Sequence, residues 1–136
     1  MNRPRAHPDR REAGTALAET VLVLGVLALL VFGVVQYAID EYAEQAAQAA
    51  ASLALATARA QNGTADAGQA AARQELTQLT GALHDTAVTV TRNTDTDTVT
   101  VHVTGHVDTL LGLTQTITVA DAGPVDRFQA NDGATP

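Results

Sequence analysis

Residues 14–40 read GTALAETVLVLGVLALLVFGVVQYAID, and this stretch decides the fold of the chain. Twenty consecutive residues within it, 20–39, carry no charge, and Gln36 is their one strongly polar side chain. As an α-helix rising about 1.5 Å per residue they would cover about 30 Å, the thickness of the hydrocarbon core of a bilayer. The sequence therefore predicts a membrane span at about residues 20–39.

One acid, Glu19, stands at the start of this span, and no other charge lies between Glu12 and Asp40. A carboxylate at the edge of a membrane helix is unfavourable without a partner, so Glu19 is the first candidate functional residue. Gly25 and Gly33 lie about two turns apart, roughly on one face, where small residues let neighbouring helices approach closely. Glycine is also common in membrane helices, so helix packing through these two residues is one of two interpretations.

Charge is distributed unevenly along the chain, which has a formal net charge of −7 and contains no cysteine. Residues 1–14 hold four arginines against two acids, and residues 15–136 hold four arginines against thirteen acids. No basic residue follows the span until Arg59, so the positive-inside rule predicts a cytoplasmic N-terminus and an extracytoplasmic C-terminal part. An acidic exterior argues against a nucleic-acid partner, which requires a basic surface.

Beyond the span, local patterns predict a small α+β domain. The alanine-rich stretch to about residue 61 continues the first helix to Asn62-Gly63, and Thr64 can cap a second helix over about residues 65–80. Alternating valines and threonines then predict a hairpin around the polar turn 93–97 and a third strand near residues 116–119. Leu76, Leu79 and Leu83 are expected to cover one sheet face, with Leu53 and Leu55 adding a surface.

The predicted organisation has four parts. Residues 1–14 form a polar, basic leader rather than folded structure, and residues 15–61 form the transmembrane and extended helix. Residues 62–121 form the extracytoplasmic domain, a short helix on a small three-stranded antiparallel sheet, and residues 122–136 form a flexible tail. The apolar loop at residues 110–113 is expected to close the open end of the sheet, and contact with a neighbouring molecule is the second interpretation.

No constellation of catalytic residues is recognisable, so we expect no enzyme activity, no catalytic residue, no cofactor and no small-molecule substrate. His102, His106 and Asp108 share one face of a strand, but without a tight ligand spacing a solvated strand face is the better interpretation than a metal site. Asp95 and Asp97 lack the glycine and the downstream glutamate of a calcium loop, and turn formation explains them better.

The N-terminal pattern resembles that of type IV pilin-like subunits, most closely the TadE-like proteins of tight-adherence pili. The resemblance lies in REAG at residues 11–14, followed by TALAETVL at residues 15–22, and the order of membrane helix, alanine-rich extension and valine-alternating strands supports it more weakly. It implies that a prepilin peptidase removes the leader between Gly14 and Thr15, which would make Glu19 the fifth residue of the mature chain. It also implies assembly with other pilin or pseudopilin subunits, in which the Thr15 amine pairs with Glu19 of a neighbour.

Two features depart from the major pilins of this type, which are very short and usually carry tyrosine after the glutamate. Here Thr20 follows, and an outer domain is present, which favours a minor pilin or pseudopilin. The expected location is the cell membrane, in contact with lipid, with extraction into a surface pilus as a further option.

Two other interpretations of the N-terminus remain open. An ordinary signal peptide would have a shorter apolar core, although Ala47-Gln48-Ala49 offers a small-x-small site. A plain uncleaved anchor would make the chain an extracytoplasmic binding or envelope domain that never polymerises. Cleavage after Gly14 distinguishes the pilin-like interpretation from both.

Overall fold

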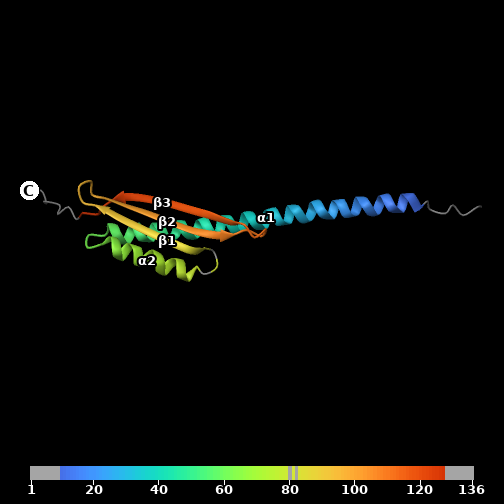
Figure 1. The fold of residues 1–136 in the computed structure, drawn as a ribbon. Helices are drawn as coiled ribbons and strands as arrows, with labels where there is room; N and C mark the ends of the chain where they lie inside the picture. Colours follow the sequence, from blue (N-terminus) through green and yellow to red (C-terminus); the bar gives the residue numbers. More distant parts are fainter. Residues whose placement is uncertain (1–9, 80, 82, 128–136) are drawn as a thin grey trace, which may run out of the picture. The chain divides into compact units, whose positions relative to one another are not determined.

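The computed structural model describes residues 10–79, 81 and 83–127. Along the chain these form α1 (Arg10–Arg59), α2 (Ala65–Gln78), β1 (His84–Asn93), β2 (Thr98–Asp108) and β3 (Thr114–Pro124) (Figure 1). A long apolar helix, a short helix and a three-stranded antiparallel sheet confirm the predicted α+β class. The chain divides into two compact units, Met1–Tyr37 and Ala38–Pro136.

The described part of the first unit is the N-terminal portion of α1. Alanine, leucine and valine dominate it, and no proline interrupts the helix. Residues 10–14 already belong to α1, so the prediction that the whole leader is unfolded was wrong for them. Residues 1–9 of the predicted leader lie outside the described residues.

The sheet of the second unit is a meander in the order β1-β2-β3, with both neighbouring pairs antiparallel. Val90 pairs with Val101 and Val103 pairs with Val119, so alternate valines gather on one face. Because side chains alternate along a strand, the threonines between them gather on the opposite face, which is largely exposed. The period-2 pattern of the sequence thus becomes one buried and one solvated sheet face.

The outer part of α1 covers the valine face with alanines. Their spacing of three and four residues places them on one side of the helix. They are packed in one core with the fully buried Val99, Val101 and Val103, and the buried alanines of this core are Ala47, Ala50, Ala51, Ala54 and Ala58. Small side chains let helix and sheet approach closely, so the core is compact although it contains no aromatic residue among its buried members.

The second helix is held against α1 and β1. Thr64 caps it, since its hydroxyl accepts a hydrogen bond from the backbone N–H of Ala67 at 3.1 Å. A Cβ added to Gly68 would lie 2.7 Å from the carbonyl oxygen of Ala54, so glycine is required where the two helices meet. The side-chain amide of Gln69 donates to the carbonyl of Val88 and thereby ties α2 to the outer edge of β1.

The structure corrects several expectations about the outer domain. The compact unit that contains the sheet begins at Ala38, because the outer part of α1 contributes to its core. Leu55 is buried as expected, whereas Leu53 is exposed. Strand β3 continues to Pro124, past the point at which a flexible tail was expected.

The residues after β3 are also anchored. The N–H of Val125 donates to the carbonyl of Asp97 at 2.8 Å, and the N–H of Asp126 donates to the carbonyl of Arg59 at 2.9 Å. Residues 128–136 of the predicted tail lie outside the described residues. Gly63 follows the end of α1, and its backbone is not left-handed. An added Cβ there would lie 2.3 Å from the carbonyl oxygen of Thr57, so close approach explains this glycine.

Candidate site for processing and assembly

The N-terminal part of α1 exposes apolar side chains around its whole circumference. Leu29, near the middle of the apolar stretch, is 74% exposed, and no residue of the most apolar window is buried. Leaving a leucine or valine in water rather than an apolar environment costs about 1.5–3 kcal/mol per side chain. The exposed large hydrophobic residues of this stretch are Leu17, Val21, Leu22, Val23, Leu24, Val26, Leu27, Leu29, Leu30, Val31, Phe32, Val34, Val35 and Tyr37. The chain itself supplies no cover for this surface among the described residues.

Within the described part of the chain, one helix is long and apolar enough to cross a membrane, and it spans Gly14–Arg59. Its apolar stretch agrees with the span predicted at about residues 20–39. The hydroxyl of Thr20 donates to the carbonyl of Ala16 at 2.8 Å, which satisfies this polar group inside the helix. Such internal satisfaction is what a helix in lipid requires.

The predicted cleavage site, Gly14 and Thr15, lies within the first turns of α1. A peptidase that reads an extended backbone would have to unwind these turns. Glycine lowers helix stability by about 1 kcal/mol relative to alanine, so Gly14 makes this unwinding easier. Nothing lies within 4 Å of a Cβ added to Gly14, so packing within the described chain does not require glycine there.

Glu19 lies one helical turn beyond Thr15, about 6 Å farther along the axis. Its side chain is exposed, and among the described residues it makes no hydrogen bond or ion pair. The structure therefore places the carboxylate at the start of the apolar stretch, within reach of a group from outside the chain. Thr15 and Glu19 lie four residues apart on the same helix.

Gly25 and Gly33 are also open positions. Nothing lies within 4 Å of a Cβ added to either residue. Each glycine nevertheless weakens the helix by about 1 kcal/mol relative to alanine. Their presence has no explanation in the packing of the described chain, which is consistent with a role in contact with another helix.

The histidines considered for metal binding lie on the threonine face of the sheet. His102 is exposed, and a ring nitrogen of His106, Nδ1, lies 3.1 Å from the hydroxyl of Thr116. Asp108 lies 3.4 Å from Nε2 of His84 and accepts a hydrogen bond from Thr114. No group of three or more potential ligands among the described residues is arranged to hold a metal ion.

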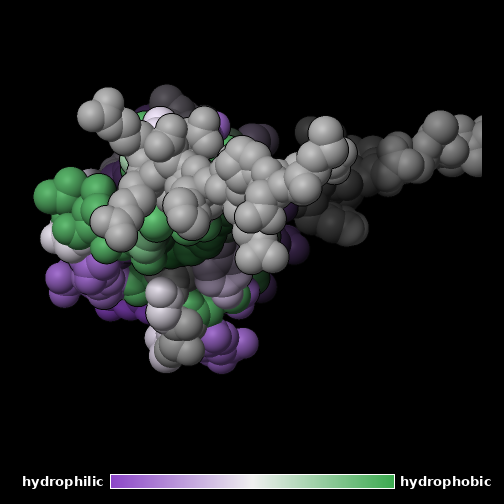
Figure 2. Space-filling model, turned by 90° about the vertical axis from the view of Figure 1, so that its right-hand side faces the viewer, coloured by the Kyte–Doolittle hydropathy of each residue, from purple (hydrophilic) through white to green (hydrophobic). Residues whose placement is uncertain are grey.

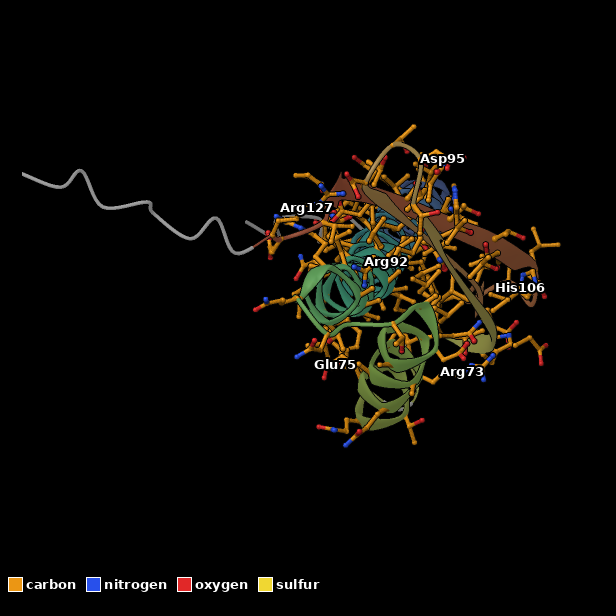
Figure 3. All side chains as sticks on the ribbon, turned by 90° about the vertical axis from the view of Figure 1, so that its left-hand side faces the viewer. Arg73, Glu75, Arg92, Asp95, His106 and Arg127 are labelled. Carbon is orange, nitrogen blue, oxygen red and sulfur yellow. The ribbon has the colours of Figure 1, made fainter. Side chains whose placement is uncertain are left out.

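Three arginines that the sequence analysis did not single out hold the end of the domain where α1 finishes. Arg92 donates to the carbonyls of Ala58 and Gly63. Figure 3 shows it near the centre of the folded part, whereas Asp95 and His106 lie toward the outside. Arg59 donates to the carbonyl of Pro124 at 2.6 Å and pairs with Asp126 at 2.9 Å. Arg127 pairs with Asp97. Arg92 has the same strand parity as Val88 and Val90, and this parity was the signal that it points inward.

A helix of this length and exposure, continuous with a small α+β unit, could anchor that unit to a membrane. Residues 14–56 match the family described as TadE-like protein, so this segment is TadE-like, as its sequence predicted. The match begins at Gly14, includes Glu19 and both span glycines, and ends within the alanine face of α1.

No curated protein and no solved structure matches the chain. The family match covers less than half of the chain and stops before α2 and the sheet. The function of the outer domain must therefore be argued from its own residues.

Proposed function

We propose that the chain is a pilin-like structural subunit, a minor pilin or pseudopilin, of a tight-adherence pilus or a related secretion apparatus. In this proposal it is not an enzyme, and a prepilin peptidase matures it between Gly14 and Thr15. The observation that carries the proposal is the uncovered apolar helix with Glu19 at its start, since the TadE-like match falls on this same segment.

The proposed assembly depends on a charge pair. Cleavage would free an α-amine at Thr15, and such amines are largely cationic at neutral pH. In a staggered bundle this amine would meet Glu19 of a neighbouring subunit. In the pair each charge neutralises the other, whereas a single charge is costly in an apolar environment. Losing one partner therefore leaves the other uncompensated. The pair would therefore set the axial register between subunits.

The two glycines of the span support the same proposal. Helices in lipid associate by close packing, and small residues at the contact allow it. Gly25 and Gly33 are open on their outer side, and the long apolar residues around them would contact lipid before assembly and other helices afterwards.

Maturation is tested by co-expression with a prepilin peptidase, followed by intact mass measurement of the membrane-extracted protein. We expect the chain to lose fourteen residues, Gly14→Leu to block this loss, and the matched control Gly33→Leu to be processed normally. A native N-terminus at Met1 in the presence of active peptidase, or one near Ala50, would contradict the proposal.

The assembly role is tested with Glu19→Ala. This variant should insert into the membrane and be processed, yet lose crosslinking to partner pilins. Glu44→Ala, which removes an exposed acid from the outer part of the same helix, should retain normal crosslinking. Normal partner recovery by the Glu19 variant would instead favour a non-polymerising, membrane-anchored binding or envelope domain.

A further inference from the structure

The β2–β3 connection presents leucines to the outside on a well-formed turn. Leu111 is 87% exposed and Leu113 is 65% exposed, so the loop does not close the end of the sheet. The turn is held by hydrogen bonds from the N–H of Thr109 to the carbonyl of Leu113 at 2.7 Å and from the N–H of Gly112 to the carbonyl of Thr109 at 2.9 Å. Gly112 takes the left-handed conformation, with φ of 75°, that such a tight turn requires. The leucines are therefore displayed by a defined structure.

The turn lies at the end of the second unit where α1 enters it. Arg59 contacts Pro124, so the last turn of α1 and the end of β3 are at one common end. Going back ten residues along β3 from Pro124 to Thr114 covers about 33 Å. Going back along α1 from Arg59 by the same distance reaches about residue 37, at about 1.5 Å per residue. Within the second unit, Figure 1 shows β3 beside the outer part of α1 and the β2–β3 turn at the opposite end of the sheet from the β1–β2 turn.

Two further features point to a lipid surface as the partner of this turn. Tyr42, on α1 at this end, is 52% exposed, and tyrosine is enriched where membrane helices meet water. Residues 109–120 carry no charge, although the domain as a whole is acidic. An uncharged leucine tip, on a unit that also exposes Tyr42, suits the boundary between headgroups and acyl chains. Figure 2 shows a patch of hydrophobic surface at the left margin of the molecule in this view.

We propose that the turn at residues 110–113 inserts into the outer leaflet of the bilayer that holds residues 20–39. The domain would then have a second, reversible attachment to the membrane beside its helix. Because the turn carries no basic residue, the attachment is apolar and does not depend on anionic lipid. This inference rests on the membrane anchoring in the proposed function.

Single-cysteine labelling tests the inference directly, because the chain has no cysteine of its own. The full-length protein is placed in phosphatidylcholine vesicles, and a polarity-sensitive fluorophore is attached at Leu111→Cys or Leu113→Cys. Both positions are exposed, so the fold tolerates the label. Lipids with brominated acyl chains quench a fluorophore only on contact. We expect at least twofold stronger quenching at these two positions than at Thr94→Cys, an exposed residue in the β1–β2 turn at the other end of the sheet.

A label at Leu29→Cys, in the middle of the span, separates the two levels of the proposal. Strong quenching at position 29 without quenching at 111 and 113 would overturn the inference and leave the proposed anchoring intact. Absence of quenching at position 29 would overturn the anchoring itself. If the fluorophore at position 111 reports an apolar environment that is lost when the protein is diluted in lipid, the partner of the turn is a neighbouring protein. This result would also overturn the lipid assignment.

Discussion

Arg92 is a charged residue on the face of the sheet that packs against the core. It stands opposite Val99 in the β1–β2 ladder and directs its guanidinium to the carbonyls of Ala58 and Gly63. These carbonyls lie at the C-terminal end of α1 and just beyond it, where backbone oxygens lack partners within the helix and where a positive charge is favourable. The side chain therefore joins the end of the helix, the following turn and the first strand.

Replacing Arg92 by methionine should destabilise the outer domain by about 1–3 kcal/mol, because the carbonyls lose a charged donor while the side-chain volume is roughly kept. The measurement is the urea midpoint of the full-length protein in detergent micelles. Arg73→Met is the matched control, since Arg73 is exposed on α2 and should give a change within about 0.5 kcal/mol. Equal midpoints for the two variants would show that Arg92 has no capping role.

The alanine face of α1 is the element on which the outer domain is built. Alanine keeps the helix close to the sheet, and a larger side chain on this face would have to displace the fully buried valines of β2. The neighbouring exposed face of the same helix has no such restriction. The same helix thus has a packing face of small residues in its outer, C-terminal part and an uncovered apolar surface in its N-terminal part.

Ala50→Leu should destabilise the domain by about 1–3 kcal/mol, because Ala50 is fully buried against the core. Ala49→Leu makes the same chemical change on the exposed face and should leave stability nearly unchanged. Thermal unfolding followed by circular dichroism in micelles compares the two variants. If both variants unfold at the wild-type temperature, the outer part of α1 does not pack on the sheet.

The elements of this fold could be predicted because their signals are local. An uncharged run gives the span, helical spacing gives α2, and alternation gives the three strands. The packing of α1 on the sheet was predicted only through Leu53 and Leu55, and its alanine face was missed, since alanines such as Ala47 and Ala54 indicate helix propensity without indicating burial. The length of β3 was also missed, because Asp121 and Gly123 interrupt the alternation while their pairing with β2 continues.

Some residues of the candidate site could likewise be predicted from the sequence, and others could not. Gly14, Glu19 and the span glycines were recognisable because one charge and a few small residues stand out in an apolar run. The arginines at the end of the domain were not, since their partners are backbone carbonyls and acids far away in sequence. The leucine turn was visible as an apolar loop, but its level along α1 followed only from the pairing of β2 with β3 and the contact of Arg59 with Pro124.

The whole chain has two parts with opposite requirements, an apolar helix with a basic start and an acidic folded domain. The four arginines before the span and the thirteen acids after Gly14 favour one orientation, with the N-terminus in the cytoplasm. In the reverse orientation the arginines would have to cross the bilayer and the acidic domain would remain inside. The cysteine-free sequence again allows a direct measurement of this orientation.

Asp95→Cys, in the exposed turn between β1 and β2, should react with a membrane-impermeant maleimide in intact spheroplasts. Asn2→Cys, in cells without prepilin peptidase so that the leader is retained, should react only after the membrane is permeabilised. The positive-inside distribution is the cause of both results, because the opposite topology would require four guanidinium groups to be translocated. Substituting the four arginines that precede the span by glutamine should therefore weaken the preference and increase labelling at position 2. In the sequence that keeps its four arginines, labelling at position 2 together with protection at position 95 would establish the opposite topology. In that topology neither extracellular assembly nor contact of the leucine turn with the outer leaflet is possible.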